Sequence, residues 1–291
     1  MRKANPVLRE LGFQPDDRVV VVHADDIGMC QATLPAIDEL MAFGLVTSAS
    51  AMVPCLWFLE VVAWHQRNPQ FDLGIHLTLT SEWDRYRWGP ISTRAQASGL
   101  MDDQGYFHRT TSAVRRLARR EVVGVEMRCQ IDRAARLGFA PTHIDNHMFV
   151  VMCDEFSEDY LQIGCELGIP AFMTCTPWNS PGEQEWLQRR AEEWENRAQP
   201  VFDCCKVVTR RGNVENNDAF VQQVFEHLPS GLSCVLLHPA IDTPEIRQIT
   251  GDWQGRVADF KAFRRPALRE YIRKLGIQLI SYQTLRDAMR R

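Results

Sequence analysis

The sequence lacks the spacings that usually mark structural cysteine sites or nucleotide sites. Its nine cysteines are an odd number and include no Cys-x-x-Cys pair, so we expect neither a disulfide framework nor a zinc ribbon. No apolar run approaches the length of a membrane span, and no glycine-rich phosphate or dinucleotide loop follows a predicted strand. These absences favour a cytoplasmic protein with reduced thiols and no membrane segment. Any metal site is expected to use His and Asp.

An excess of positive charge is also missing. The 291 residues carry a formal net charge of -4 with a pI of about 6.1, so the basic surface that typically binds nucleic acid is not expected. The basic residues at positions 2 and 3 are followed by no apolar segment, and a secretory signal is therefore not expected. The length and a hydrophobic content of 45% suit one α/β domain over residues 1–291. The oligomeric state stays open, a homodimer included.

Short apolar runs alternate with longer amphipathic segments along the chain. The alternation predicts strands over residues 18–23, 47–53, 73–79, 142–145, 171–174, 201–207, 233–237 and 278–280, and helices over 31–43, 56–68, 113–137, 155–167, 184–197, 219–227 and 257–275. Parallel strands covered by helices follow from this order, either as an open doubly wound sheet or as a barrel. About seven or eight parallel strands favour a TIM-like (β/α) barrel. The connections 80–109, 176–184 and 242–255 exceed the usual loop length and are predicted to be binding loops.

One predicted strand ends in two neighbouring carboxylates. Four valines at positions 19–22 are followed by His23 and Ala24, and then by Asp25 and Asp26. Adjacent like charges at the end of a buried strand are costly unless a cation, a hydrogen-bond network or water offsets the repulsion. A divalent metal beside one carboxylate would leave the other free to take a proton. The alternative is an ordinary turn in which one of the two caps the following helix.

Further predicted strands end in histidine. His76 alternates with leucines and should point away from them. His143, Asp145 and His147 would share one face if their stretch is extended, and His238 follows another apolar strand. A neutral imidazole is a good zinc ligand and commonly has a carboxylate partner on its second nitrogen. Because the carboxyl ends of parallel strands gather at one end of an α/β fold, we expect these side chains to converge. Each could instead be a structural, hydrogen-bonded polar residue.

Four motifs occur in a specific order along the chain: His23-Ala24-Asp25-Asp26-Ile27-Gly28, Gly74-Ile75-His76-Leu77, Thr142-His143-Ile144-Asp145-Asn146-His147 and His238-Pro239-Ala240. In this order and context they resemble the YdjC-type carbohydrate deacetylases, also called chitooligosaccharide deacetylase-like proteins. The similarity covers most of the chain. Each motif alone is unspecific, but the set is specific.

The resemblance implies a distorted (β/α) barrel that removes an N-acetyl group from an amino sugar or short oligosaccharide with one divalent metal ion, zinc or magnesium. By position, Asp26, His76 and His147 would be the metal ligands, Asp25 the base and His238 the acid. Metal-bound water would then attack the acetyl carbonyl while Asp25 takes its proton, and His238 would protonate the departing amine.

Other activities would fit parts of this pattern. The same site could belong to a metal-dependent hydrolase of another small amide or to a sugar isomerase. A non-catalytic carbohydrate-binding protein on the same fold is a further alternative, although binding alone does not need the base Asp25 beside the metal ligand Asp26. Acetate release from a panel of N-acetyl sugars would separate these functions.

Several residues near these motifs have weaker predicted roles. His23, His143 and Asp145 could support the site from behind, and Trp83 and Trp88 in the loop after His76 could stack on a sugar ring or simply anchor the loop.

The chain also departs from its relatives at two places. It has His23 where relatives often have Asn, and Ile27 where they often have Phe. Met148 and Phe149 stand where many relatives carry further histidines, which puts a sugar subsite in question more than the metal.

Overall fold

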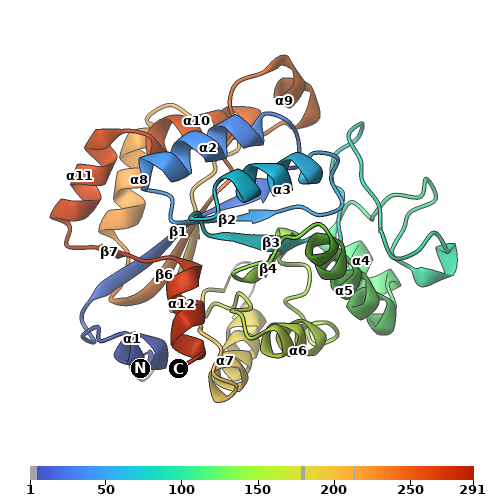
Figure 1. The fold of residues 1–291 in the computed structure, drawn as a ribbon, viewed down its shortest axis with the longest axis horizontal. Helices are drawn as coiled ribbons and strands as arrows, with labels where there is room; N and C mark the ends of the chain where they lie inside the picture. The colour runs from blue at the N-terminus through green and yellow to red at the C-terminus, as the bar shows by residue number, and fades with distance from the viewer. Residues whose placement is uncertain (1–4, 178–180, 213) are drawn as a thin grey trace.

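A computed structural model describes residues 5–177, 181–212 and 214–291, and its described part contains a parallel sheet of seven strands (Figure 1). The strands are β1 (Arg18–Ile27), β2 (Ser48–Ala51), β3 (Leu73–Leu77), β4 (Ile144–Asn146), β5 (Cys204–Val207), β6 (Gly231–Leu237) and β7 (Gln278–Leu279). Their order is β4-β3-β2-β1-β6-β5, with β7 paired to the beginning of β1. The predicted valine strand is thus the centre of the sheet, as suits β-branched side chains buried on both faces.

The two edges of this sheet are joined by a segment that was predicted as a strand, residues 171–174. Isolated parallel bridges link Ile144 to Ala171 on one side and Thr174 to Phe202 on the other. The N–H of Phe172 donates to the Ile144 carbonyl and the N–H of Cys175 to the Phe202 carbonyl, both at 2.9 Å. These bonds connect β4 to the segment just before β5 and curl the sheet into a distorted barrel, which confirms the predicted fold class.

Helices cover the outside of the sheet (Figure 1). In chain order they are α1 (Pro6–Glu10), α2 (Thr33–Phe43), α3 (Phe58–Arg67), α4 (Thr111–Leu117), α5 (Arg120–Arg136), α6 (Ser157–Leu167), α7 (Pro181–Asn196), α8 (Asn217–Glu226), α9 (Pro244–Ile249), α10 (Trp253–Phe263), α11 (Pro266–Lys274) and α12 (Tyr282–Met289). Helices α2, α3, α8, α10 and α11 lie on one side and α4 to α7 on the other, while α1 packs against α12 near the two termini. Among the described residues no helix is both long enough and apolar enough to cross a membrane.

Two predicted helices are each divided in the structure. Residues 257–275 are divided between α10 and α11 at Arg265, which precedes Pro266. The proline ring disfavours helical dihedral angles at the residue before it, and Arg265 is accordingly extended, with φ -85° and ψ 128°. Residues 113–137 form α4 and α5, since the chain is extended at Ala118 (φ -75°, ψ 135°) before α5 begins. Both breaks redirect the chain around the curved sheet.

The predicted long loops are only partly loops. The 242–255 connection was predicted to be a loop, but it contains α9 and the start of α10. Helix α9 begins at Pro244, and the Thr243 hydroxyl caps it by accepting from the Ile246 N–H at 3.2 Å. Within 176–184, residues 178–180 lie outside the described residues, and α7 already begins at Pro181. The 80–109 connection is a loop apart from the 3₁₀ turn Gln96–Ser98.

The inner face of β1 leads from an apolar floor to a polar rim. Val19 and Val21 belong to a buried cluster with Phe202 and other apolar residues at the bottom of the barrel. Because side chains of a strand alternate, the next inward residues are His23 and then Asp25. The fold therefore places the predicted polar residues at the carboxyl ends of the strands.

Candidate active site

The predicted side chains converge in one cavity. A cavity of about 640 Å³ lies at the carboxyl ends of the strands and is lined by Asp25, Asp26, His76, His147 and His238, together with loop residues. These five come from the ends of β1, β3, β4 and β6, which are far apart in sequence. The expectation that the strand ends bring them together is confirmed.

Three of these side chains could hold a metal ion. Asp26 Oδ1 lies 3.4 Å from His76 Nε2 and 3.0 Å from His147 Nδ1, and the two imidazole nitrogens are 3.3 Å apart. All three residues are buried, and the contacts between Asp26 Oδ1 and the two imidazole nitrogens are not aligned as hydrogen bonds in the described part of the chain. One carboxylate and two imidazoles aimed at a common point fit a divalent cation such as zinc.

Each imidazole is oriented by a carboxylate on its other nitrogen. The Nδ1–H of His76 donates to Asp145 Oδ1 at 2.8 Å, and the register of β3 and β4 places these two residues side by side. The Nε2 of His147 lies 3.1 Å from Glu82 Oε2. Such carboxylate partners fix the tautomer of metal-binding histidines and raise their basicity. The nitrogens left over are the two that face Asp26.

The electrostatics of this group also suit a cation. Burial alone would lower the pKa of both imidazoles, but the neighbouring carboxylates outweigh it: Asp145 and Asp25 raise the pKa of His76, and Glu82 and Asp26 raise that of His147 to about 9. These pKa values reflect a strongly negative local potential, which a bound divalent ion would also neutralise.

A local irregularity in β1 brings both aspartates to the cavity. Ala24 pairs with Ala49 and Ile27 with Ala51, so β1 has one more residue than β2 between these pairs. Asp26 takes up the extra length with a φ of 64°, a left-handed conformation that is uncommon outside glycine. The helix-capping alternative is wrong, because α2 begins only at Thr33 and has no side-chain cap.

A buried arginine, which the sequence did not predict, faces the same carboxylate. Arg256 on α10 is 3% exposed; its Nη1 lies 2.9 Å from Asp26 Oδ2 and its Nε 2.8 Å from Asp252 Oδ1. The pKa of Asp26 is lowered despite its burial, with His147 and Arg256 as the main causes. Arg256 therefore holds one oxygen of Asp26 and leaves the other facing the imidazoles.

His23 lies beneath the rim and links two carboxylates. Its Nδ1 is 2.7 Å from the Ser48 hydroxyl, and its Nε2 is 2.8 Å from Asp145 Oδ2 and 3.1 Å from Asp25 Oδ1. Burial opposes ionisation, but Asp145 and Asp25 outweigh it and raise the pKa of His23 to about 9. The ring does not reach the cavity; it supports the predicted base from below.

His143 lies deeper still and does not line the cavity. Its ring stacks on Tyr282 with centroids 3.8 Å apart, and its Nδ1 is 2.9 Å from the Thr142 hydroxyl. A Cβ at position 74 would overlap the ring, so Gly74 makes room for it. Burial lowers the pKa of His143, which keeps the ring neutral. His143, Asp145 and His147 thus lie at successive depths of the barrel.

His238 stands on the opposite side of Asp25 from His23. Its Nε2 is 3.8 Å from Asp25 Oδ2, and its Nδ1 is 2.8 Å from the hydroxyl of Thr209, on the loop after β5. The Thr209 hydroxyl donates in turn to Asp259 on α10. Burial lowers the pKa of His238. The imidazole therefore faces the cavity with one nitrogen and is fixed from behind by the other.

The two tryptophans of the loop after β3 differ in position. Trp83 lines the cavity and its ring lies over the Arg256 guanidinium, with 5.5 Å from the ring centroid to Cζ. Trp88 is buried behind it, and its indole N–H donates to the Thr80 carbonyl at 2.8 Å. Trp83 can contact a ligand, whereas Trp88 anchors the loop.

The sequence did not predict Glu82, Arg256, Thr209 or Asp259. Glu82 follows a strand that ends at the site, so its position after β3 was a usable signal. Arg256 and Asp259 lie on an outer helix and Thr209 on a loop, and nothing in their local sequence indicates that they face the barrel.

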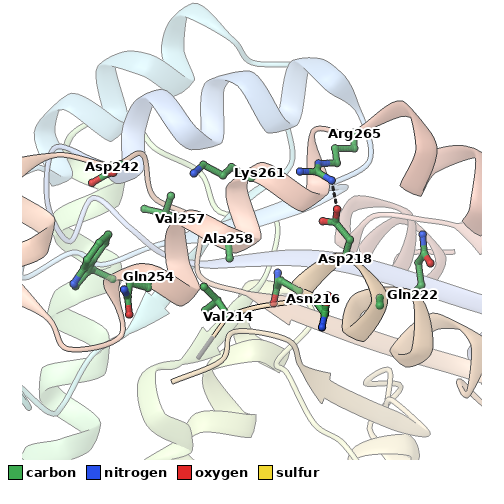
Figure 2. Close-up of a pocket in the computed structure, with 13 residues that line it drawn as sticks. Val214, Asn216, Asp218, Gln222, Asp242, Gln254, Val257, Ala258, Lys261 and Arg265 are labelled. Atoms are coloured by element: carbon green, nitrogen blue, oxygen red, sulfur yellow. Dashed lines mark hydrogen bonds and ion pairs between the residues drawn. The ribbon is translucent and has the colours of Figure 1, made fainter. Parts of the chain in front are cut away.

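A second, larger cavity lies on the outside of the barrel along α10 and the start of α8 (Figure 2). It measures about 760 Å³ and contains the ion pair between Asp218 and Arg265. None of the predicted site residues is among the described side chains that line it. The described part of its lining includes no histidine and no cluster of carboxylates, so the smaller cavity is the candidate active site.

Known proteins resemble this chain in sequence and in fold. Residues 19–274 match the family model described as YdjC-like protein. The chain is 31% identical over 276 residues to a carbohydrate deacetylase of Thermus thermophilus, covering 94% of this chain and 95% of that protein. It is 24% identical over 278 residues to a chitooligosaccharide deacetylase of Yersinia enterocolitica, covering 91% and 98%. A crystal structure from Enterococcus faecalis, provisionally described as a cellobiose-phosphate cleavage protein, has the same fold, with a TM-score of 0.78 at 22% identity over 92% of this chain and 99% of that one.

Proposed function

Because the chain belongs to the YdjC-like protein family, we propose that it is a metal-dependent deacetylase that removes an N-acetyl group from an amino sugar or a short oligosaccharide. The names of its relatives support the reaction class. The observation that carries the proposal for this chain is the convergence of Asp26, His76 and His147 on one point, with Asp25 and His238 beside them.

The proposed ligands of the metal are Asp26, His76 and His147, and zinc or magnesium is the proposed ion. The buried Oδ1 of Asp26, which faces both imidazoles without an aligned hydrogen bond, and the two oriented rings support this assignment. A divalent ion bound there would supply Lewis-acid polarisation of a carbonyl oxygen and acidification of water. Asp145 and Glu82 hold the two rings in place and bind no substrate in this scheme.

Asp25 is the proposed base. Its Oδ1 is held by His23, so that Oδ2 faces the cavity and can take a proton from a water molecule attacking the acetyl carbonyl. The neighbouring Asp26 is engaged by Arg256 and the imidazoles and is not available for this task.

His238 is the proposed acid. Its Nε2 lies 3.8 Å from Asp25 Oδ2 at the same wall of the cavity, so both groups can reach one scissile amide bond from the same side. Protonation of that nitrogen turns a poor leaving group into an amine, and removing such a proton donor typically lowers the rate by about 10²–10⁴-fold.

The remaining lining of the cavity suits a sugar ring. Trp83 offers an apolar face, and Met148 and Phe149 line another part of the cavity in left-handed conformations with φ of 53° and 52°. These two residues occupy the place of further histidines in many relatives, so we assign them to sugar selection.

The test combines metal analysis with acetate release from a panel of N-acetyl sugars. Asp26→Ala and His147→Ala should lose both the bound metal and the activity, whereas Asp84→Ala, a change at an exposed loop carboxylate, should keep both. Absence of a bound divalent ion together with activity that survives chelation would contradict the proposal. Sugar binding without turnover would favour a non-catalytic protein, and sugar conversion without acetate an isomerase.

A further inference from the structure

A chain of hydrogen bonds extends from His238 into the interior, away from the cavity. The Thr209 hydroxyl lies 2.8 Å from His238 Nδ1 and donates to Asp259 Oδ2. The backbone N–H of His238 reaches the same two oxygens, at 3.0 Å from Thr209 Oγ1 and 3.1 Å from Asp259 Oδ2. Three residues, from the loop after β5, the end of β6 and α10, therefore form one continuous hydrogen-bonded line.

The line ends at the carboxyl group of Asp259, beside which no described residue provides a free cation to stabilise a negative charge. Asp259 is fully buried, and its Oδ1 has no hydrogen-bond partner in the described chain. The nearby guanidinium of Arg256 is engaged by Asp26 and Asp252. Burial raises the pKa of Asp259 to about 7 against the opposing hydrogen bonds from Thr209 and the His238 backbone. A buried group that holds a proton near neutral pH is a candidate for proton transfer.

The proposed acid, His238, needs a source of protons behind it. Burial lowers the pKa of His238, so the ring is neutral near neutral pH and carries one proton on one of its two nitrogens. A neutral imidazole that gives up its only N–H must gain a proton on its other nitrogen at the same time. The only group placed to provide it at Nδ1, among the described residues, is the Thr209 hydroxyl.

We propose that Thr209 and Asp259 are positioning residues that form a proton relay behind His238, so that the imidazole can protonate the departing amine while remaining neutral. This inference rests on the proposed deacetylase function and deepens it. It assigns a proton source to His238 and a role in proton transfer to the buried carboxyl group of Asp259.

The transfer balances in protons and charge. The Thr209 hydroxyl donates to Asp259 when that carboxyl is ionised, and protonation of Asp259 reverses this bond. At the start of the relay, the protonated Asp259 therefore donates its Oδ2–H to Thr209, the Thr209 O–H donates to His238 Nδ1, and Nε2 carries a proton. As the Nε2–H bond breaks and the new N–H bond of the amine forms, the Thr209 proton moves to Nδ1 and the Asp259 proton moves to Thr209. The ring ends as the Nδ1–H tautomer, and Asp259 ends as a carboxylate. The relay resets when the proton taken from water by Asp25 passes to Nε2, which lies 3.8 Å from Asp25 Oδ2, while Nδ1 returns its proton to Thr209 and the Thr209 hydroxyl returns its own to Asp259.

The test uses two substrates that differ in their need for a proton. An N-acetylated amino sugar has an amine leaving group that must be protonated, whereas 4-nitrophenyl acetate has a leaving group that departs without one. Thr209→Val and Asp259→Asn should lower kcat for the sugar amide by about 10²-fold or more with little change in KM. Both should retain most of the esterase activity. Thr209→Ser, which keeps the hydroxyl, should retain both activities.

A purely structural role predicts a different result. Parallel loss of amide and ester hydrolysis would overturn the relay, and so would undiminished amide hydrolysis in Thr209→Val. This variant is nearly isosteric and keeps the test valid if Asp259→Asn does not fold. Failure of the wild-type protein to release acetate from any acetylated sugar would overturn the proposed function itself, whereas wild-type turnover with unaffected variants would overturn the relay alone.

Discussion

The charge on the buried ring of His23 predicts a pH-dependent part of the protein's stability. His23 is fully buried and contacts Asp145 and Asp25, whose carboxylates raise its pKa from 6.5 to about 9 in the folded protein. In the unfolded chain the pKa returns to about 6.5. Replacement of His23 by Asn, the residue that relatives often have, removes this titrating group while keeping a polar side chain.

The sign and size of the effect follow from linkage. Because the folded pKa is raised, the stabilisation is fully present below about pH 6.5 and is lost as the pH rises through about 9. At about 1.4 kcal/mol for each unit of pKa, the whole effect is about 3 kcal/mol, and most of it lies between about pH 7 and pH 9.5. The free-energy difference between wild type and His23→Asn should therefore shrink by about 2–3 kcal/mol over this range.

The assay is urea unfolding of the chelator-treated proteins at these two pH values, which avoids coupling to metal binding. The matched control is His143→Asn, since His143 lies with its ring centroid 5.0 Å from that of His23 but has a lowered pKa. Its free-energy difference from wild type should not change between the two pH values. An equal change in both variants, or none in His23→Asn, would refute the argument that, of these two rings, only that of His23 is charged.

Three further predictions follow from other contacts of the site. Glu82→Gln should weaken zinc binding by about 10- to 100-fold in calorimetry, because it removes the carboxylate that orients the imidazole of His147, a proposed ligand. Asp84→Asn, at an exposed neighbouring residue, should leave the affinity unchanged, and equal affinities of the two variants would contradict the prediction. Arg256→Met should lower the free energy of unfolding by about 3–5 kcal/mol because the buried Asp26 and the partly buried Asp252 lose their guanidinium partner. Arg264→Met at the surface should cost less than about 1 kcal/mol, and similar losses in the two variants would refute the argument. Gly74→Ala should lower the thermal midpoint, at a cost of about 1–3 kcal/mol, because the new Cβ would overlap a buried imidazole; an unchanged midpoint would show that the ring can move.

The fold was predictable because its main determinants are local patterns. The valine run at 19–22 and the alternation of apolar strands with amphipathic helices were sufficient for a parallel barrel. Pro266 was a sequence signal for a helix break, but the apolar periodicity over residues 257–275 favoured the prediction of one long helix instead. The weak strand at 171–174 forms only isolated bridges, since its pairing depends on both barrel edges being already in place.

The candidate site was predictable only where its residues end strands. Asp26, His76 and His147 could be placed together because parallel strands share one carboxyl edge. Arg256 and Asp259 reach the site from an outer helix, and their contacts depend on how α10 packs over the rim. No periodicity in α10 distinguishes these two inward polar residues from ordinary helix positions, so the tertiary packing alone reveals them.

The extra residue in β1 explains how two identical neighbouring side chains can have different roles. In a regular strand, Asp25 and Asp26 would point to opposite faces, and only one would enter the barrel. The left-handed turn at Asp26 instead brings both into the cavity with different partners: Arg256 and two imidazoles surround Asp26, while His23 and His238 flank Asp25. A metal ligand needs a fixed, charged oxygen, whereas a base needs an oxygen free to accept a proton. The backbone irregularity, rather than the residue type, therefore distinguishes the two roles proposed for these side chains.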